Sequence, residues 1–323
     1  MKIALPLLVL FWGSVTLSTK LGANERGSFC GLTEFKHWKR LAAIPLDFPT
    51  YHPQGLLKVG DDFYLSTVDK GGKRGFLIQF VLGPSQTQRG LIGRQILRME
   101  LTDGARYHPG GIDWDSIRGI LYSPVAEYRA QSSASVLAVD LARFRPEKIF
   151  EVQDHMGTTV FQPAGAQGAE DLLHFFNWDV GMVTADIHGK TRPLFVPPKT
   201  KEYGDYEYQD CKHVSETEAV CGATRGHVFQ DGALDLIRFD RPTTDGGAPG
   251  FRVLKRIKVP NVWTNGRKIW PSFFGLPLTQ NPMAYEIVPQ GSAGEGHLRL
   301  YFMPYDGSRS RLLIYDLPSQ DCP

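Results

Sequence analysis

The sequence has 323 residues, of which 22% are charged and 42% are hydrophobic, as in an ordinary globular protein. Its net charge at pH 7 is +2 and it has no run of Lys and Arg, which excludes a surface built to bind nucleic acid or an anionic membrane. A single core rarely grows beyond about 250–300 residues, so a chain of this length is divided into domains or built by repetition.

Residues 1–23 are predicted to be a signal peptide. Lys2 gives a positive start, and the apolar run over residues 3–17 is short for a membrane span, although an uncleaved anchor is the alternative. Cleavage would remove Lys2 and Lys20, which lowers the net charge from +2 to zero. We therefore expect a secreted or periplasmic protein, with residues 24–323 as one domain and no membrane contact after cleavage.

Four cysteines are placed in a way that predicts disulfides rather than a metal site. Cys211 and Cys221 bracket a short segment that reads as two strands meeting at a turn, so they could bridge neighbouring strands. Cys30 and Cys322 lie at the two ends of the mature chain. A bond between them would close the polypeptide into a ring and restrain the unfolded state by roughly 4–5 kcal/mol. Four buried thiols are the alternative.

Short runs rich in Val, Ile, Phe and Tyr recur between Gly, Pro and Asp clusters, which is typical of an all-β protein. Aligning these runs shows a repeat of about 45–55 residues with roughly four strands per unit, the pattern of β-propeller blades. The sequence therefore predicts a β-propeller of five blades. The units cover approximately residues 50–105, 106–152, 153–200, 205–260 and 280–318.

Two segments lie outside the five units. Residues 35–48 are predicted to form the outermost strand of the last blade, which would close the ring and bring Cys30 beside Cys322. Residues 261–281 are either a degenerate sixth blade or a long aromatic loop. Long ordered loops often act as lids, so Trp263 and Trp270 are candidate substrate-binding residues, with packing as the alternative role.

Three histidines recur at the start of successive units and predict a site at one end of the propeller. The inner strand of a blade starts on the face where the second strand connects to the third. We therefore expect His52, His108 and His155 to crowd one channel mouth, with Tyr208 completing the ring. Acidic residues should stand a little further out, at Asp69, Glu127, Asp179 and Asp306. A structural role in turns is the alternative for each histidine.

Imidazoles beside carboxylates can transfer protons or hold a divalent cation. We expect His52 and His108 to be catalytic, either one serving as general base, and His155 to bind substrate. Arg225 replaces the acid of the fourth unit, where it would clamp a carboxylate or phosphate or form an internal ion pair. A further set of strand-ending carboxylates is predicted to cap turns, at Asp140, Asp186, Asp240 and Asp316.

Oxygen donors near the starts and ends of the inner strands are candidate metal ligands. Hard oxygen donors favour calcium, whereas three histidines would suit zinc, manganese or iron. The sequence thus predicts a divalent metal ion, with calcium as the first choice. The candidate ligands are Gln54, Asp113, Asn177, Asp179, Asp210 and Glu286.

The motifs HPQGL (residues 52–56) and HPGGID (residues 108–113) resemble an uncharacterised family of propeller-like proteins from bacteria and fungi. This resemblance implies the fold only. The chain is also distantly similar to the gluconolactonase and arylesterase group of calcium-dependent propeller hydrolases, whose metal is held by Glu, Asn and Asp side chains. Here Gln54 stands where that group has its Glu, and histidines precede the glycines.

Motifs for a Ser nucleophile, a zinc protease and a nucleotide-binding loop are absent from the sequence. The favoured function is a metal-assisted hydrolase of a small ester, lactone or sugar-like substrate at the channel mouth. One alternative is a carbohydrate lyase or glycosidase. The other is a non-catalytic propeller that binds a glycan or a secreted protein. We expect a monomer with a small-molecule or carbohydrate ligand.

Overall fold

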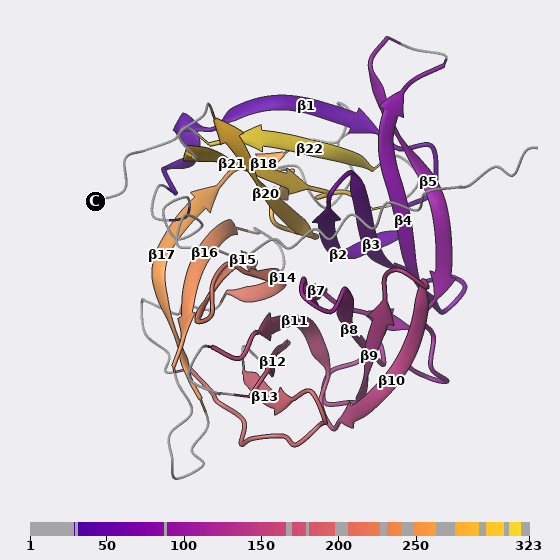
Figure 1. Ribbon diagram of the computed structural model, residues 1–323, viewed down its shortest axis with the longest axis vertical. Coiled ribbons are helices and arrows are strands. Elements are labelled where there is room, and N and C mark those ends of the chain that lie inside the picture. The colour runs from indigo at the N-terminus through magenta and orange to yellow at the C-terminus, as the bar shows by residue number, and fades with distance from the viewer. Residues whose placement is uncertain are drawn as a thin grey trace, which may run out of the picture.

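Five small β-sheets surround a common axis in the computed structural model, which makes the protein a five-bladed β-propeller (Figure 1). The predicted fold and blade number are therefore confirmed. No helix within the described part of the chain is long and apolar enough to cross a membrane. The structure describes residue 29 and residues 32–86, 89–165, 170–178, 181–197, 206–226, 231–240, 249–262, 275–290, 295–306 and 310–317.

Each blade is an antiparallel sheet whose strands run from the axis outward. Blade I contains β2 (His52–Val59), β3 (Asp62–Asp69), β4 (Arg74–Pro84) and β5 (Leu91–Glu100). Blade II contains β6 (His108–Pro109) and β7 (Asp113–Asp115), then β8 (Ile120–Ala126), β9 (Ala134–Asp140) and β10 (Arg145–Val152). Blade III contains β11 (Met156–Gln162), β12 (Leu172–Asn177) and β13 (Met182–Asp186).

The last two blades complete the ring. Blade IV contains β14 (Glu207–His213), β15 (Glu218–Arg225), β16 (Asp231–Phe239) and β17 (Phe251–Val259). Blade V contains β20 (Met283–Gln290), β21 (Glu295–Phe302), β22 (Arg311–Asp316) and β1 (Lys39–Pro45). A short 3-10 helix, η1 (Phe35–His37), precedes β1, and a separate pair, β18 (Asn261–Val262) and β19 (Leu276–Pro277), lies between blades IV and V in sequence.

The position of a strand within its blade explains its residue pattern. The second strand of blade I is buried along all six central residues, because neighbouring blades cover both of its faces. The outermost strand of blade II is mostly exposed and carries Arg145, Glu147 and Lys148. Continuous apolar runs are therefore typical of strands in the middle of a blade, and mixed polar runs are typical of the outermost strands.

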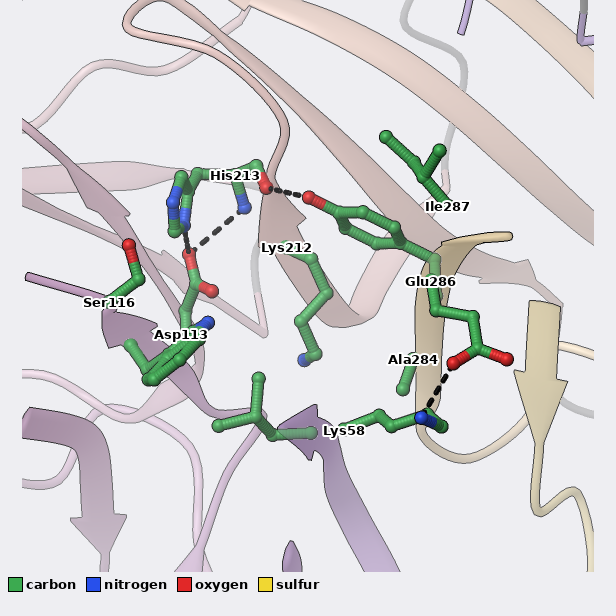
Figure 2. Close-up of a pocket in the computed structure, with 11 residues that line it drawn as sticks. Lys58, Asp113, Ser116, Lys212, His213, Ala284, Glu286 and Ile287 are labelled. Carbon is green, nitrogen blue, oxygen red and sulfur yellow. Dashed lines mark hydrogen bonds and ion pairs between the residues drawn. The ribbon is translucent and has the colours of Figure 1, made fainter. Parts of the chain in front are cut away.

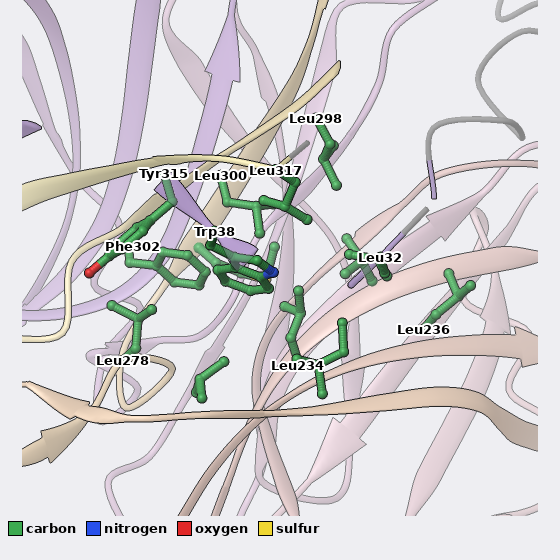
Figure 3. Close-up of a cluster of buried hydrophobic side chains, with 14 of the residues drawn as sticks. Leu32, Trp38, Leu234, Leu236, Leu278, Leu298, Leu300, Phe302, Tyr315 and Leu317 are labelled. Atoms are coloured by element: carbon green, nitrogen blue, oxygen red, sulfur yellow. The ribbon is translucent and has the colours of Figure 1, made fainter. Parts of the chain in front are cut away.

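The first and last strands of the chain close the ring, as predicted. β1 pairs antiparallel with β22, from Lys39 opposite Asp316 to Pro45 opposite Arg311. Trp38, directly before β1, lies in a buried apolar cluster with Leu32 and with side chains of blades IV and V (Figure 3). Cys30 and Cys322 lie outside the described residues, so their disulfide stays a prediction. Trp263 and Trp270 also lie outside them.

The second predicted disulfide is present. Cys211 on β14 and Cys221 on β15 are directly opposite in the register and form the bond, and both are completely buried. Disulfides persist in oxidising compartments, which agrees with an exported protein. The signal peptide itself, residues 1–23, lies outside the described residues.

Turn capping by strand-ending carboxylates is confirmed at two of the four predicted positions. Asp140 and Asp186 each accept hydrogen bonds from two backbone amides of the turn that follows. Asp316 instead pairs with the Arg299 guanidinium on the neighbouring strand β21. The expectation for Asp316 was wrong because Arg299 lies directly opposite it in the register.

The glycines of the repeated His-Pro motifs allow the inner strands to approach one another closely. A Cβ atom on Gly110 would lie 2.2 Å from the Gly157 carbonyl oxygen. One on Gly111 would lie 2.1 Å from Thr158 Oγ1 and 2.7 Å from Asp210 Oδ1. These distances are too short for any side chain, so the motif places a histidine at the end of the axis and glycines where the blades meet.

A buried histidine in blade III makes the stability depend on pH. His174 is fully buried between Thr184 and Gln162, to which its ring nitrogens are hydrogen-bonded, and burial lowers its pKa to about 3. In the unfolded chain this histidine takes up a proton near its ordinary pKa of 6.5, so stability should fall as the pH is lowered from 6.5 towards 3. His174→Gln should be destabilising at pH 7, with a difference from wild type that shrinks at lower pH. Urea unfolding of both proteins between pH 4 and pH 8 measures this; a constant difference would contradict it.

Candidate functional site

The inner strand of each blade lies nearest the axis (Figure 1). These strands are β2, β6, β7, β11, β14 and β20, and two groups of polar residues lie at their opposite ends. A parallel bridge between Gly111 and Thr158 shows that neighbouring inner strands run in the same direction. Their first residues therefore share one end of the axis, here called the histidine end. Their last residues share the other, here called the cavity end.

The structure brings the three predicted histidines together at the histidine end. The ring centroids of His52 and His108 are 6.2 Å apart, and those of His108 and His155 are 5.4 Å apart. Each histidine comes from a different blade, at the start of its inner strand. We call these three residues the histidine cluster.

His52 is held by a carboxylate from the last blade. Its Nδ1 lies 2.8 Å from Asp306 Oδ1, and Asn281 Nδ2 donates to the same oxygen at 2.9 Å. Burial raises the pKa of Asp306, but the hydrogen bond and charge of His52 outweigh it and hold this pKa below its usual value. An ionised carboxylate only accepts hydrogen bonds, so His52 Nδ1 donates to Asp306 and Nε2 takes no part in this contact.

Backbone strain occurs directly before His52. Tyr51 has a φ of 51°, in the left-handed region that residues other than glycine rarely adopt. Its ring packs on Phe76, with the centroids 5.6 Å apart. Strained residues of this kind persist where the surrounding structure holds them, and they cluster at functional sites.

His108 and His155 are deeply buried and neutral at pH 7. Burial, followed by the neighbouring His155 and His52 rings, lowers the pKa of His108 well below its usual value. Burial also lowers the pKa of His155, although hydrogen bonds to the Glu127 and Arg129 carbonyls oppose the shift. His155 Nδ1 donates to those carbonyls, which leaves its Nε2 as a lone-pair acceptor. Within the described structure, neither this Nε2 nor His108 Nδ1 has a hydrogen-bond partner.

Aromatic side chains surround the histidine cluster. The Trp178 ring lies 3.7 Å from the His155 ring, and the Tyr128 ring lies 4.7 Å from the His108 ring, measured between centroids. Lys70 Nζ stands over the Tyr128 ring at 5.4 Å. These three residues were not among the predicted site residues, although each lies one or two positions after the end of a second strand, where polar residues were expected at this mouth.

The cavity end holds a pocket of about 290 Å³ between the last residues of the inner strands (Figure 2). Its charged groups are paired with one another. Lys58 pairs with Glu286 at 2.5 Å, and His213 Nδ1 lies 3.0 Å from Asp113 Oδ2. The Lys212 side chain is 2% exposed, and its ammonium donates to Asp210 and to the Ile112 and Cys211 carbonyls. These contacts stabilise the fold at this end.

Two predicted metal ligands, Asp210 and Asp113, tie all five blades together at the axis. Asp210 on blade IV accepts hydrogen bonds from the amides of Leu56, Ile112 and Met283, in blades I, II and V. Asp113 on blade II accepts from the amides of Phe161 and His213, in blades III and IV. Burial raises the pKa of Asp210 to about 7, although Lys212 and the amides oppose the shift. We call these two carboxylates the axial hub.

Five of the six predicted oxygen ligands lie in the described part of the chain, and each of them has hydrogen-bond or ion-pair partners within the protein. Gln54 donates to the Pro53 carbonyl, and Asn177 bonds to Asp154 and to the Gly181 amide. Glu286 is paired with Lys58 at the cavity end. Asp179 lies outside the described residues. In the described ranges, no group of three or more His, Cys, Asp or Glu side chains is arranged to hold a metal ion. We therefore assign no step to a metal, and the cofactor stays a prediction.

Arg225 and Tyr208, which were also predicted at the channel mouth, do not belong to the histidine cluster. Arg225 pairs with Asp231 at 2.5 Å, which is the internal ion pair that the sequence left open. Tyr208 does not reach the mouth. Its ring packs against Phe176 and its hydroxyl donates to Asp235. In the register Tyr208 occupies the place of Pro53 and Met156, directly before the bulge of its strand, so it stands one residue after the position of the histidines.

Comparisons with known proteins found structures with a similar arrangement of strands. A tail fibre of Staphylococcus aureus phage P68 has 10% identity and a TM-score of 0.47, over 88% of this chain and 53% of the fibre chain, so the chain spans about half of that protein. Sqt1 of Saccharomyces cerevisiae has 9% identity and a TM-score of 0.41, over 86% and 99%. An α-L-arabinofuranosidase of Podospora anserina, in complex with cellotriose, has 9% identity and a TM-score of 0.39, over 87% and 98%.

None of these similarities bears on activity at such low identity, and a comparison with curated proteins found no match. The sequence-based similarity to gluconolactonases stays a prediction. A family model, however, matches residues 19–320. The chain therefore belongs to a family of unknown function (DUF6454).

Proposed function

We propose that this protein hydrolyses a small ester, lactone or sugar-like substrate at the histidine end, with His52 as general base. The proposal is carried by one observation, the 2.8 Å hydrogen bond between His52 Nδ1 and Asp306 Oδ1. A carboxylate that fixes one nitrogen of an imidazole orients the ring and stabilises the imidazolium that forms during proton transfer. The His52 side chain is 18% exposed, so a water molecule can reach it.

The chemistry of an ester or lactone illustrates the step. His52 Nε2 removes a proton from water as the water oxygen bonds to the carbonyl carbon. Asp306 stabilises the resulting imidazolium. The tetrahedral intermediate then breaks its bond to the alkoxide oxygen, and His52 returns the proton to that oxygen. The products are a carboxylic acid and an alcohol, or a hydroxy acid from a lactone, and His52 ends the cycle neutral.

The neighbouring histidines supply binding contacts. Because burial keeps both rings neutral, His155 offers the lone pair of Nε2, and His108 Nδ1 has no partner within the described structure. Buried polar atoms without partners cost free energy, and a substrate that satisfies them gains affinity. Both nitrogens are buried, so the hydroxyl group of a substrate would bind them only after the covering side chains move.

The proposal is tested by replacing His52 and Asp306 and assaying chromogenic esters, lactones and glycosides. His52→Ala should lower kcat/KM by about 10²–10⁴-fold, the usual contribution of a general base. Asp306→Asn should lower it by at least about tenfold, because the Asn amide no longer stabilises the imidazolium. Both losses should appear mainly in kcat.

Asp69→Asn is the matched control. Asp69 occupies in blade I the place that Asp306 has in blade V, but its carboxylate accepts a hydrogen bond from the Gly72 amide of its own turn. This variant should keep wild-type activity. Equal turnover by wild type and His52→Ala, or no turnover by wild type of any compound in the panel, would overturn the proposal.

A further inference from the structure

A second pocket, of about 380 Å³, lies next to the histidine cluster in blades II and III. Of the residues that line it, only Asn177 was among the predicted site residues. Its volume is at the lower end of the range typical of small-molecule sites. The lining residues are Gln131, Gln153, Asp154, Asn177, Gly181, Leu194 and Val196. We call this the amide pocket.

The amide pocket is joined to the histidine cluster by hydrogen bonds. Asp154 Oδ1 accepts from the backbone amide of His155, and Asp154 Oδ2 accepts from Asn177 Nδ2, both at 2.7 Å. Asn177 Oδ1 in turn accepts from the Gly181 amide at 2.7 Å. Asn177 is directly followed by Trp178, whose ring packs on His155. A ligand in the pocket would therefore lie beside His155.

The lining of the pocket indicates the chemistry of its ligand. The exposed side-chain amides of Gln131 and Gln153 supply both hydrogen-bond donors and acceptors, which suits hydroxyl groups, while Asn177 and Asp154 are held by each other and by backbone amides. No Lys, Arg or His is among its lining residues, which disfavours a phosphate or carboxylate ligand. Leu194 and Val196 are 48% and 64% exposed and offer an apolar wall to carbon-bound hydrogens.

Two backbone features keep the pocket open. A Cβ on Gly181 would lie 3.0 Å from Leu194 Cδ1 and 3.1 Å from Asn177 Nδ2, so glycine leaves room on this wall. Gln131 has a φ of 48°, in the left-handed region. Strain of this kind outside glycine is uncommon and often accompanies ligand contacts.

We infer that the amide pocket binds one neutral sugar unit, so that the substrate is a carbohydrate of two or more units reaching from the histidine cluster into this pocket. The inference rests on the proposed function for the position of the reacting bond, but binding in the pocket does not require turnover. It narrows the sugar-like substrates of the proposed function to uncharged oligosaccharides that carry an ester or lactone group at the histidine end.

The test measures binding of neutral disaccharides and trisaccharides by isothermal titration to the His52→Ala variant, in which hydrolysis is removed. Gln131→Ala and Gln153→Ala should each raise Kd by about tenfold, since each removes one or two hydrogen bonds. Both glutamines are exposed, so neither variant should disturb folding. The matched control is Gln79→Ala in blade I, whose amide donates to Asp62 far from the pocket and which should leave Kd unchanged.

Different outcomes separate the two proposals. Unchanged Kd values in both glutamine variants, or no binding of any neutral oligosaccharide, would overturn the inference about the pocket. The proposed function would then be decided by the chromogenic assay alone. If oligosaccharide binding is tight and depends on Gln131 and Gln153, the inference about the pocket is supported. If His52→Ala then shows full turnover, the role of His52 as general base is overturned.

Discussion

Replacing Asp210 by Asn is expected to lower the free energy of unfolding by about 3–5 kcal/mol, because it leaves the buried Lys212 ammonium without its counter-ion. Asp210 is completely buried and its oxygens accept amides from three other blades. An Asn side chain keeps one acceptor and turns the other into a donor facing a backbone N–H. Chemical unfolding at pH 8, above the pKa of about 7, measures the effect on the ionised form.

The double variant Asp210→Asn/Lys212→Met separates the lost ion pair from the lost hydrogen bonds. It should recover part of the stability, since removing both charges of a buried pair costs less than removing one. Asp140→Asn is the control, because Asp140 caps an exposed turn, and it should cost less than about 1 kcal/mol. If Asp210→Asn lowered the free energy of unfolding no more than Asp140→Asn does, the axial hub would not be a main stabilising contact between the blades.

Trp38→Ala should destabilise the protein by about 3–5 kcal/mol, the usual effect of truncating a large buried aromatic residue. Trp38 is 8% exposed, its Nε1 donates to the Thr33 carbonyl, and its ring stacks on Phe302 of β21 at 6.3 Å. The loss should loosen the contact between β1 and β22. Amide hydrogen exchange should therefore rise in β22 more than in β9 of blade II.

Leu41→Ala is the control for this prediction, because Leu41 lies on the same strand β1 but is 42% exposed. It should change the unfolding free energy by no more than about 0.5 kcal/mol. Equal losses of unfolding free energy in the two variants, or amide exchange that rises uniformly in all blades, would show that Trp38 does not stabilise the pairing of β1 with β22.

The repeat made the blades predictable from the sequence. Second and third strands are buried on both faces, so they appear as continuous apolar runs at a nearly constant spacing. The same spacing predicted that His52, His108 and His155 share one end of the axis, since each begins an inner strand. The closing strand at residues 35–48 could be predicted because an unpaired edge has to be covered.

Roles that depend on contacts between blades could not be predicted. A buried Asp such as Asp210 looks the same in a sequence whether it binds a metal or accepts amides from other blades. Tyr208 aligns with Pro53 and Met156 and not with the histidines, and this offset of one residue appears only in the strand register. The amide pocket combines Gln131 and Leu194 from separate turns, and no local motif connects them.

The pairing of β1 with β22 also affects how a new chain can be completed during synthesis. β1 is translated among the first elements and its partner among the last. At roughly 5–20 residues per second, β1 remains without its partner strand β22 for tens of seconds. An open edge can pair with another chain, so nascent copies on the same messenger RNA are exposed to strand exchange until the last blade leaves the ribosome.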